Sequence, residues 1–171
     1  MTEGPRIRLR AWAEADLPAL MAWRNDVALQ AQLLARVRGS SLEQVRRWAQ
    51  ERSAGPHSML QVIAARADDC ALGYVQLRSR EDAVLPAQLG ICLQPSSQGV
   101  GIGREALHLL LDHVRRSSPL QAIGLRVRAD NTRAIRCYEA LGFGRCELLQ
   151  EDTFIDGAWR DVLLMQRFVR H

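Results

Sequence analysis

The chain contains no lysine. All 23 of its basic residues are arginines, and with 19 acidic residues the formal net charge is +4 over 171 residues. A Walker-type phosphate loop needs Gly-Lys-Ser/Thr after its glycines, so this class of nucleotide site is excluded. The arginines are scattered along the chain, whereas a dedicated nucleic-acid-binding protein concentrates them, so we expect no nucleic acid as a partner. Their bidentate guanidinium groups suit a small polyanionic ligand.

Long apolar runs are also missing. No stretch approaches the roughly 18 apolar residues of a membrane span, and the first residues, Met1 to Arg6, lack the apolar core of a signal peptide. These absences predict a cytoplasmic protein with no membrane partner. The 47% apolar and 25% charged residues are typical of a globular protein. Without a linker, a repeat or a low-complexity stretch, we expect one domain over residues 1–171.

Cysteine and histidine are few, four of each, and neither shows the spacing of a metal site. His108 and His113 are five positions apart, which places them on different faces of a helix. Buried free thiols are the simplest interpretation of the widely spaced cysteines, because no Cys-x-x-Cys pair occurs. We expect no metal. The cysteines are Cys70, Cys92, Cys137 and Cys146.

The hydrophobic pattern predicts a mixed sheet with helices packed on it. Only the strand–helix–strand crossover around residues 89–128 must be parallel. The predicted helices are a segment from residue 14 and the ranges 26–34, 41–52, 101–116 and 131–141. The predicted strands are residues 6–10, 59–65, 71–78, 86–94, 123–128, 143–155 and 159–169.

Local signals mark the ends of several elements. Ser41 with Gln44 three residues later forms a capping box, and Asn131 is an N-cap candidate. Gly142 is placed to end the helix that Asn131 begins. Asp156-Gly157, between two strand patterns, is a strong hairpin signal.

A glycine-rich loop joins a strand to a helix. Gly99, Gly101 and Gly103 occupy alternate positions, with Gln98 and Arg104 on either side. Glycines let the backbone approach a ligand closely, and the first amides of a helix lie at the positive end of its dipole. The loop therefore predicts an anion site suited to phosphate.

Two other interpretations of this loop remain open. Gly101-x-Gly103-x-x-Ala106, with Asp130 after the next strand, also matches a dinucleotide fingerprint. That motif usually begins a doubly wound fold, whereas here some 90 residues precede it and little α/β alternation follows. The glycines can also simply turn a corner of the chain.

Two motifs in order resemble the GNAT superfamily of N-acetyltransferases. Gln98-x-x-Gly101-x-Gly103 is similar to the Q/R-x-x-G-x-G/A pattern that binds the pyrophosphate of acetyl-CoA in that family. Asn131-x-x-Ala134-x-x-x-Tyr138-x-x-x-Gly142-Phe143 resembles the family's next helix. The element order resembles the family fold over almost the whole chain. The resemblance implies an α/β (α+β) GNAT acyl-CoA N-acyltransferase fold, a mixed, largely antiparallel sheet with helices on both faces.

Three further segments look like one branch of the family. They are Ile7–Arg10, Ala22–Asp26 and Asp156-Gly157 followed by Asp161-Val162. This branch includes acetyltransferases of ribosomal-protein N-termini and of amino groups on nucleotide-linked sugars. The resemblance implies acetyl-CoA as co-substrate and a primary amine as acceptor, on a small molecule or at a protein N-terminus. Relatives of this kind often pair as homodimers, so a homodimer is an expectation by analogy.

For the cofactor, the resemblance implies that strand 90–93 splays from strand 123–128 and frees backbone amides for pantetheine and the thioester carbonyl. Ile91 and Leu93 are the candidates, through their backbones, although both side chains also suit a core strand. Asn131 and Arg136 are candidates for the cofactor arm and phosphates, with N-capping and a solvated surface arginine as the alternatives. The loop residues expected at the pyrophosphate are Gln98, Gly99, Val100, Gly101, Ile102, Gly103 and Arg104.

For the chemistry, the resemblance implies direct attack of a neutral amine on the acetyl thioester. Tyr138 is the candidate general acid for the departing thiolate, although it also lies on the apolar face of its helix. Many relatives have an acid where Gln88 stands, and Gln88 cannot act as a base. Glu81, Asp82 and Glu147 are alternatives, but each also suits a surface charge, and a relay through water is the preferred hypothesis.

The acceptor pocket is expected between the helical 24–56 region and the 151–160 hairpin. Trp23, Arg24 and Trp159 are the candidate substrate-binding residues, and Trp48 could join them. Trp23 and Trp48 equally suit the core. Arg24 would favour an acidic or phosphorylated acceptor if it points inward. Rival hypotheses are an acetyl-CoA sensor without catalysis, because of Gln88, and an RNA- or ribosome-associated protein, because of the pI near 9.3.

Overall fold

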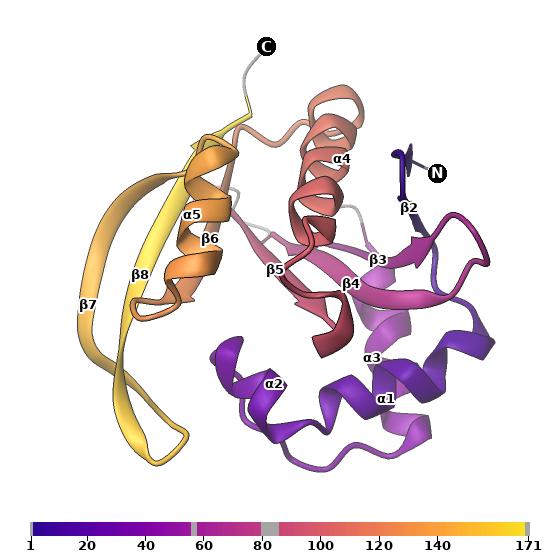
Figure 1. Ribbon diagram of the computed structural model, residues 1–171, viewed down its shortest axis with the longest axis horizontal. Helices are drawn as coiled ribbons and strands as arrows, with labels where there is room; N and C mark the ends of the chain where they lie inside the picture. The colour runs from indigo at the N-terminus through magenta and orange to yellow at the C-terminus, as the bar shows by residue number, and fades with distance from the viewer. Residues whose placement is uncertain (1, 56–57, 80–85, 170–171) are drawn as a thin grey trace.

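The computed structural model describes residues 2–55, 58–79 and 86–169, and these form an eight-stranded sheet with helices on both faces (Figure 1). The strand order is β1-β2-β3-β4-β5-β6-β8-β7. Only β5 and β6 pair in parallel within this sheet, as predicted; the other pairs are antiparallel. The strands are β1 Thr2–Glu3, β2 Ile7–Arg10, β3 Ser58–Ala65, β4 Ala71–Arg78, β5 Ala87–Leu93, β6 Ala122–Arg128, β7 Gly144–Ile155 and β8 Ala158–Phe168.

Two groups of helices cover opposite faces of the sheet (Figure 1). Helices α4 and α5 pack on one face, where a large apolar core includes Leu110, Ile123 and Ile135. Helices α1 to α3 pack on the other, around Leu20, Val45 and the buried ring of a β4 tyrosine. The helices are η1 Glu14–Asp16, α1 Leu17–Arg24, α2 Val27–Gln32, α3 Leu42–Ser53, η2 Pro95–Ser97, α4 Ile102–Ser117 and α5 Thr132–Ala140.

The predicted end signals are confirmed. The Ser41 hydroxyl accepts a hydrogen bond from the Gln44 amide, and the Gln44 side chain accepts one from the Ser41 amide. Asn131 caps α5 by accepting from the Ala134 amide. Gly142 (φ +88°) follows α5, and Asp156 and Gly157 both have positive φ, 54° and 75°, as the favoured hairpin turn requires.

The structure also departs from the prediction in detail. The short edge strand β1 was not predicted, because two residues carry no periodic signal. The second helix ends at Gln32 and not at Leu34, which is left-handed at φ +58°. Strand β7 shifts register against β8 between Leu149 and Thr153, where the Asp161 carboxylate accepts from the Glu151 amide. These features depend on pairing between segments, which local periodicity does not report.

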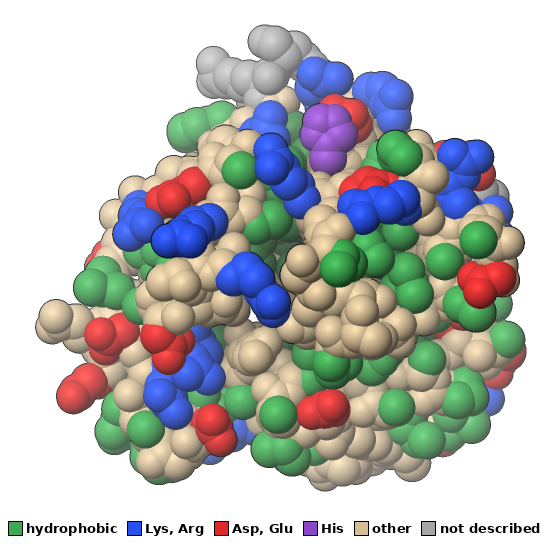
Figure 2. All heavy atoms as spheres, in the orientation of Figure 1, with side chains coloured by type: hydrophobic (Ala, Val, Ile, Leu, Met, Phe, Trp, Pro, Cys, Tyr) green, Lys and Arg blue, Asp and Glu red, His purple; other side chains and the backbone are tan. Residues whose placement is uncertain are grey.

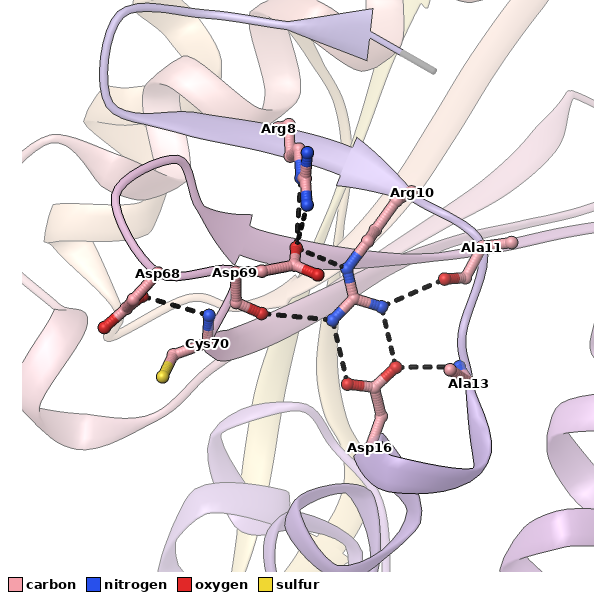
Figure 3. Close-up of polar contacts among 8 residues, drawn as sticks. All are labelled: Arg8, Arg10, Ala11, Ala13, Asp16, Asp68, Asp69 and Cys70. Carbon is pink, nitrogen blue, oxygen red and sulfur yellow. Dashed lines mark hydrogen bonds and ion pairs between the residues drawn. The ribbon is translucent and has the colours of Figure 1, made fainter.

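A buried ion pair fixes the start of α1 against the sheet (Figure 3). Arg10 on β2 donates to both carboxylate oxygens of Asp16, at 2.7 and 2.9 Å, and its Nε donates to Asp69 at 2.8 Å. Asp16 also accepts from the Ala13 amide, so the turn into α1 is closed on both sides. The contacts set the direction in which α1 runs along the sheet.

Membrane-spanning helices and metal-binding clusters are both absent from the part of the chain that the structure describes. No helix in residues 2–55, 58–79 or 86–169 is long and apolar enough to cross a membrane. No group of three or more His, Cys, Asp or Glu side chains in those same ranges is arranged to hold a metal ion.

Candidate functional site

Strands β5 and β6 diverge soon after they begin. Their parallel pairing covers only Ala87 with Ile123 and Gln88 with Gly124, whereas β4 stays paired with β5 as far as Leu93. The edge of β5 that faces β6 therefore has no strand partner beyond Gln88. This is the splay expected for residues 90–93, and it leaves backbone groups available to a ligand.

The glycine loop begins where this open edge ends. Gly99 and Gly101 are left-handed, with φ of +76° and +86°. Gly101 is the N-cap of α4 and no side chain caps the helix there, so its first amides face outward unsatisfied. At Gly103 an added Cβ would lie 3.2 Å from the Leu93 side chain, so the missing side chain lets α4 pack closely on β5.

One side chain of the loop and two from distant segments hold the loop in place. The Gln98 amide donates to the Leu93 carbonyl at 2.9 Å and accepts from Arg133 at 2.9 Å. Arg6 donates to the Val100 carbonyl at 2.7 Å. Gln98 thus holds the loop against β5 and α5, a structural role that the sequence motif did not reveal. Arg6 and Arg133 were not predicted here, because only the fold brings them to the loop.

The surroundings of the loop are positively charged. Arg104 in the first turn of α4 is exposed, and Arg133 lies close enough to contact a Cβ at Gly99 (3.2 Å). Arg136, the predicted phosphate ligand on α5, is exposed too. Figure 2 shows basic side chains gathered on this face around a hollowed strip between α4 and α5. A polyanion at the helix terminus would meet both free amides and guanidinium groups.

Tyr138 is a partly buried residue of α5. Its ring packs edge-on against Phe143, with centroids 5.9 Å apart. Burial raises the pKa of Tyr138 to about 12, so the phenol stays protonated at neutral pH and can donate a proton or a hydrogen bond. Asn131, predicted near the cofactor arm, uses its side-chain oxygen to cap α5.

Of the acids considered as a general base, the structure describes Glu147, and it also describes Gln88, which stands where many relatives have an acid. Gln88 donates to the Pro86 carbonyl at 3.2 Å. Glu147 is exposed on edge strand β7, with β8 and β6 between it and β5, so it lies away from the splay. Glu81 and Asp82 lie outside the described residues. Asp26, the N-cap of α2, acts electrostatically on the Cys92 thiol of β5, a proximity that no sequence spacing indicated.

The predicted acceptor residues divide between core and surface. Trp23 is 7% exposed and belongs to the core, its ring 6.5 Å from Tyr74. Arg24 points its guanidinium at the Trp48 ring, 4.0 Å from the centroid. Trp159 is 59% exposed near the hairpin tip.

The hairpin of β7 and β8 contacts the segment that follows α2. Arg36, in the segment after α2, donates to the Phe154 carbonyl at 2.9 Å and so joins the two regions predicted to form the acceptor pocket. Beside Trp159 lies an open pocket of about 370 Å³, lined by Ala129, Asp130, Trp159, Arg160 and Asp161. The pocket sits where β6 ends and β8 begins.

Comparison with known sequences agrees with this geometry. The family described as "Acetyltransferase (GNAT) domain" matches residues 6–144. The chain belongs to the GNAT acetyltransferase family. The chain is 33% identical over 117 residues to the N-alpha-acetyltransferase RimI of Mycobacterium tuberculosis, covering 67% of this chain and 68% of that protein. It is 32% identical over 94 residues to a spermidine N(1)-acetyltransferase of Vibrio cholerae, covering 55% of this chain and about half, 54%, of that relative.

Solved structures share the fold. A spermidine N-acetyltransferase from Vibrio cholerae, solved with CoA and spermine, superposes with a TM-score of 0.86 over 95% of both chains at 23% identity. The predicted GNAT fold, a mixed sheet with helices on both faces, is confirmed. Membership of an acetyltransferase family does not favour the dinucleotide interpretation of the glycine loop.

Proposed function

We propose that the protein transfers the acetyl group of acetyl-CoA to a primary amine by direct attack. The observation that carries this proposal is the unpaired edge of β5 running into the left-handed glycine loop at the N-terminus of α4. An extended ligand arm can lie along the strand edge while its pyrophosphate meets the helix amides. Membership of the GNAT family supports the assignment.

The cofactor is held in two parts. The amides of residues 99–104 with Arg6, Arg104 and Arg133 bind the phosphates, and the backbone of Ile91 and Leu93 pairs with pantetheine. A backbone amide of this edge also donates to the thioester carbonyl oxygen. Negative charge develops on that oxygen as the amine attacks, so a fixed donor there stabilises the transition state more than the ground state.

The reaction needs two proton transfers, one to the leaving thiolate and one from the attacking amine. The amine nitrogen bonds to the acetyl carbon, the carbon–sulfur bond breaks, and the sulfur leaves as a thiolate. Tyr138 donates its phenolic proton to that thiolate and recovers one from solvent. The attacking amine loses its proton to solvent through ordered water.

The acceptor amine is carried by a small molecule or by a protein N-terminus. The relatives reported above are named for both kinds, spermidine in one and N-alpha positions in the other. The walls of its site are the segment from Arg24 to the start of α3 and the hairpin of β7 and β8, which Arg36 and Phe154 join.

The test follows free thiol released from acetyl-CoA with peptides, polyamines, aminoglycosides, amino sugars and amino acids as acceptors. Turnover of at least one class is expected. A parallel thermal-shift measurement compares acetyl-CoA with NADH, and we expect only acetyl-CoA to raise the melting temperature. Stabilisation by NADH alone would overturn the cofactor assignment, and acetyl-CoA binding without turnover of any amine would favour a sensor.

A further inference from the structure

Three arginines from three elements gather on the face that α1 to α3 cover. Arg24 ends α1, Arg52 is in the last turn of α3, and Arg78 ends β4. Burial first, and then repulsion from Arg78 and Arg24, lower the pKa of Arg52. The exposed Glu51 next to Arg52 attracts its charge and raises its pKa, but the pKa of Arg52 remains lowered overall. The three guanidinium groups therefore share one region of space.

Two of these partly exposed side chains each hold one buried nitrogen without a partner. The Nε atoms of Arg24 and Arg52 are inaccessible to solvent and donate no hydrogen bond. Across residues 2–55, 58–79 and 86–169, no carboxylate forms an ion pair with Arg24, Arg52 or Arg78. Arg10, by contrast, has both Asp16 and Asp69. Like charges that lie close together at partly buried positions repel one another, so a bound anion would stabilise this cluster.

The trio lies beside the splay, on the face away from the glycine loop. Residues directly opposite each other in an antiparallel pair share a face of the sheet. Arg78 is opposite Gln88, the last residue of β5 that pairs with β6. Tyr74, four residues before Arg78 on β4 and so on the same face, marks this face, because its ring packs on Trp48 of α3 at 5.4 Å. Helix α4 and the loop occupy the other face.

Gln76 adds an acceptor at the same place. It is opposite Gly90, at the start of the diverging stretch, and its Nε2 would lie 2.9 Å from a Cβ added there. Its Oε1 is buried and accepts no hydrogen bond. An amine nitrogen arriving from the α1–α3 side would find this oxygen directly over β5, with the arginines beyond it.

We propose that the acceptor is a small amine that also carries an oxyanion, a carboxylate or a phosphate, and that polycationic amines are rejected. Arg24 and Arg52 bind the oxyanion with Arg78 at the rim, and Gln76 Oε1 accepts from the amine. This rests on the proposed function and names its substrate class. Trp48, stacked under Arg24 at 4.0 Å, keeps that guanidinium in place while its edge stays free to donate.

The experiment uses acceptors in matched pairs that share an amine and differ in the oxyanion. The pairs are β-alanine with propylamine, phosphoethanolamine with ethanolamine, and glucosamine 6-phosphate with glucosamine, and spermidine is added alone. We expect the more anionic member of at least one pair to have a kcat/KM at least about tenfold higher, and spermidine to be the poorest acceptor. Which pair shows the preference separates carboxylate from phosphate.

Arg24→Met and Arg52→Met keep the apolar stem and remove the charge, and exposed Arg47→Met on α3 is the control. The first two should bring the ratio within each pair close to one, whereas the control keeps it. Their melting temperatures should stay level or rise, since one of the mutually repelling charges is removed. Preference for spermidine, or an unchanged ratio in both variants, would overturn the proposal.

Calorimetric titration of the same pairs into the acetyl-CoA-bound protein separates the two proposals. If no amine turns over, the proposed function fails. Binding of the anionic members that Arg52→Met weakens by about tenfold or more would still support the oxyanion site. Equal binding of both members of every pair would remove it.

Discussion

Arg6 and Glu105 lie 99 positions apart and form a three-way contact at the glycine loop. The Glu105 carboxylate accepts from the Arg6 amide at 2.9 Å, from its Nε at 2.9 Å and from the Ile7 amide at 3.2 Å. The same guanidinium donates to the Val100 carbonyl at 2.7 Å. The start of β2, the first turn of α4 and the loop therefore move as one unit.

Replacing Glu105 should loosen that unit. Glu105→Ala leaves two backbone amides and a guanidinium without their acceptor, so we expect the free energy of unfolding to fall by about 2 kcal/mol. Asp112→Ala is the matched control, because Asp112 is a partly exposed acid on the same helix that pairs with the exposed side chains of His108 and Arg115. It should change stability by less than about 0.5 kcal/mol. Urea denaturation measures both, and equal losses would contradict the bracing role.

Stability should fall in acid through Asp16. Burial tends to raise the pKa of Asp16, but hydrogen bonds from Arg10 and Ala13 outweigh it and hold the pKa below its ordinary value. The unfolded chain therefore binds the proton first as the pH falls through about 4, and the stabilisation is lost from there downward. Urea denaturation from about pH 7 to about pH 3 should show the loss. Asp16→Asn should be less stable at neutral pH and show a shallower acid slope; an unchanged slope would contradict this.

Gly101→Glu tests the loop as an anion site. The substitution places a carboxylate beside the free amides, and the left-handed φ of +86° adds strain of about 1–2 kcal/mol. We expect the thermal shift with acetyl-CoA to disappear while the circular dichroism spectrum is kept. Gly39→Glu carries the same charge and a similar φ of +71°, with nothing within 4 Å of its Cβ, and should leave the shift intact. A full shift in Gly101→Glu would remove the loop assignment.

Tyr138→Phe tests the proton donor. The phenol is held neutral by burial, and the ring packs on Phe143, so losing only the hydroxyl should preserve the fold. We expect kcat to fall by about 10²-fold, the lower range for a positioned general acid. The Kd for acetyl-CoA, measured by calorimetry, should change by less than about threefold. An unchanged kcat would make Tyr138 a packing residue only.

Local sequence patterns predicted much of the fold. The capping box at Ser41, the cap at Asn131 and the turn at Asp156-Gly157 each depend on residues within four positions of one another, and all are present. The single parallel pair followed from the length of the crossover between β5 and β6. The glycine loop was found for the same reason, since positive φ and a bare helix terminus leave their mark in adjacent residues.

The sequence predicted only part of the site. Gln98 matched the motif, but its partner Arg133 and the neighbouring Arg6 come from segments 35 and 94 residues away from their contacts. Trp23 and Arg24 are adjacent in sequence, yet one packs in the core and the other stacks on the Trp48 ring. No spacing rule separates such neighbours, because the packing of α1 on the sheet decides which side chain turns inward.

By itself the sequence determined the family, the order of the elements and the loop suited to the donor's phosphates. These depend on backbone conformation and on hydrogen bonds between near neighbours, which composition and spacing report. Only the tertiary structure decided where β5 parts from β6, that Glu105 ties the loop to β2, and that Arg24 and Arg78 lie close enough to Arg52 to repel its charge. Each of these is a balance of burial, charge and pairing between distant segments, and it exists only once the helices lie on the sheet.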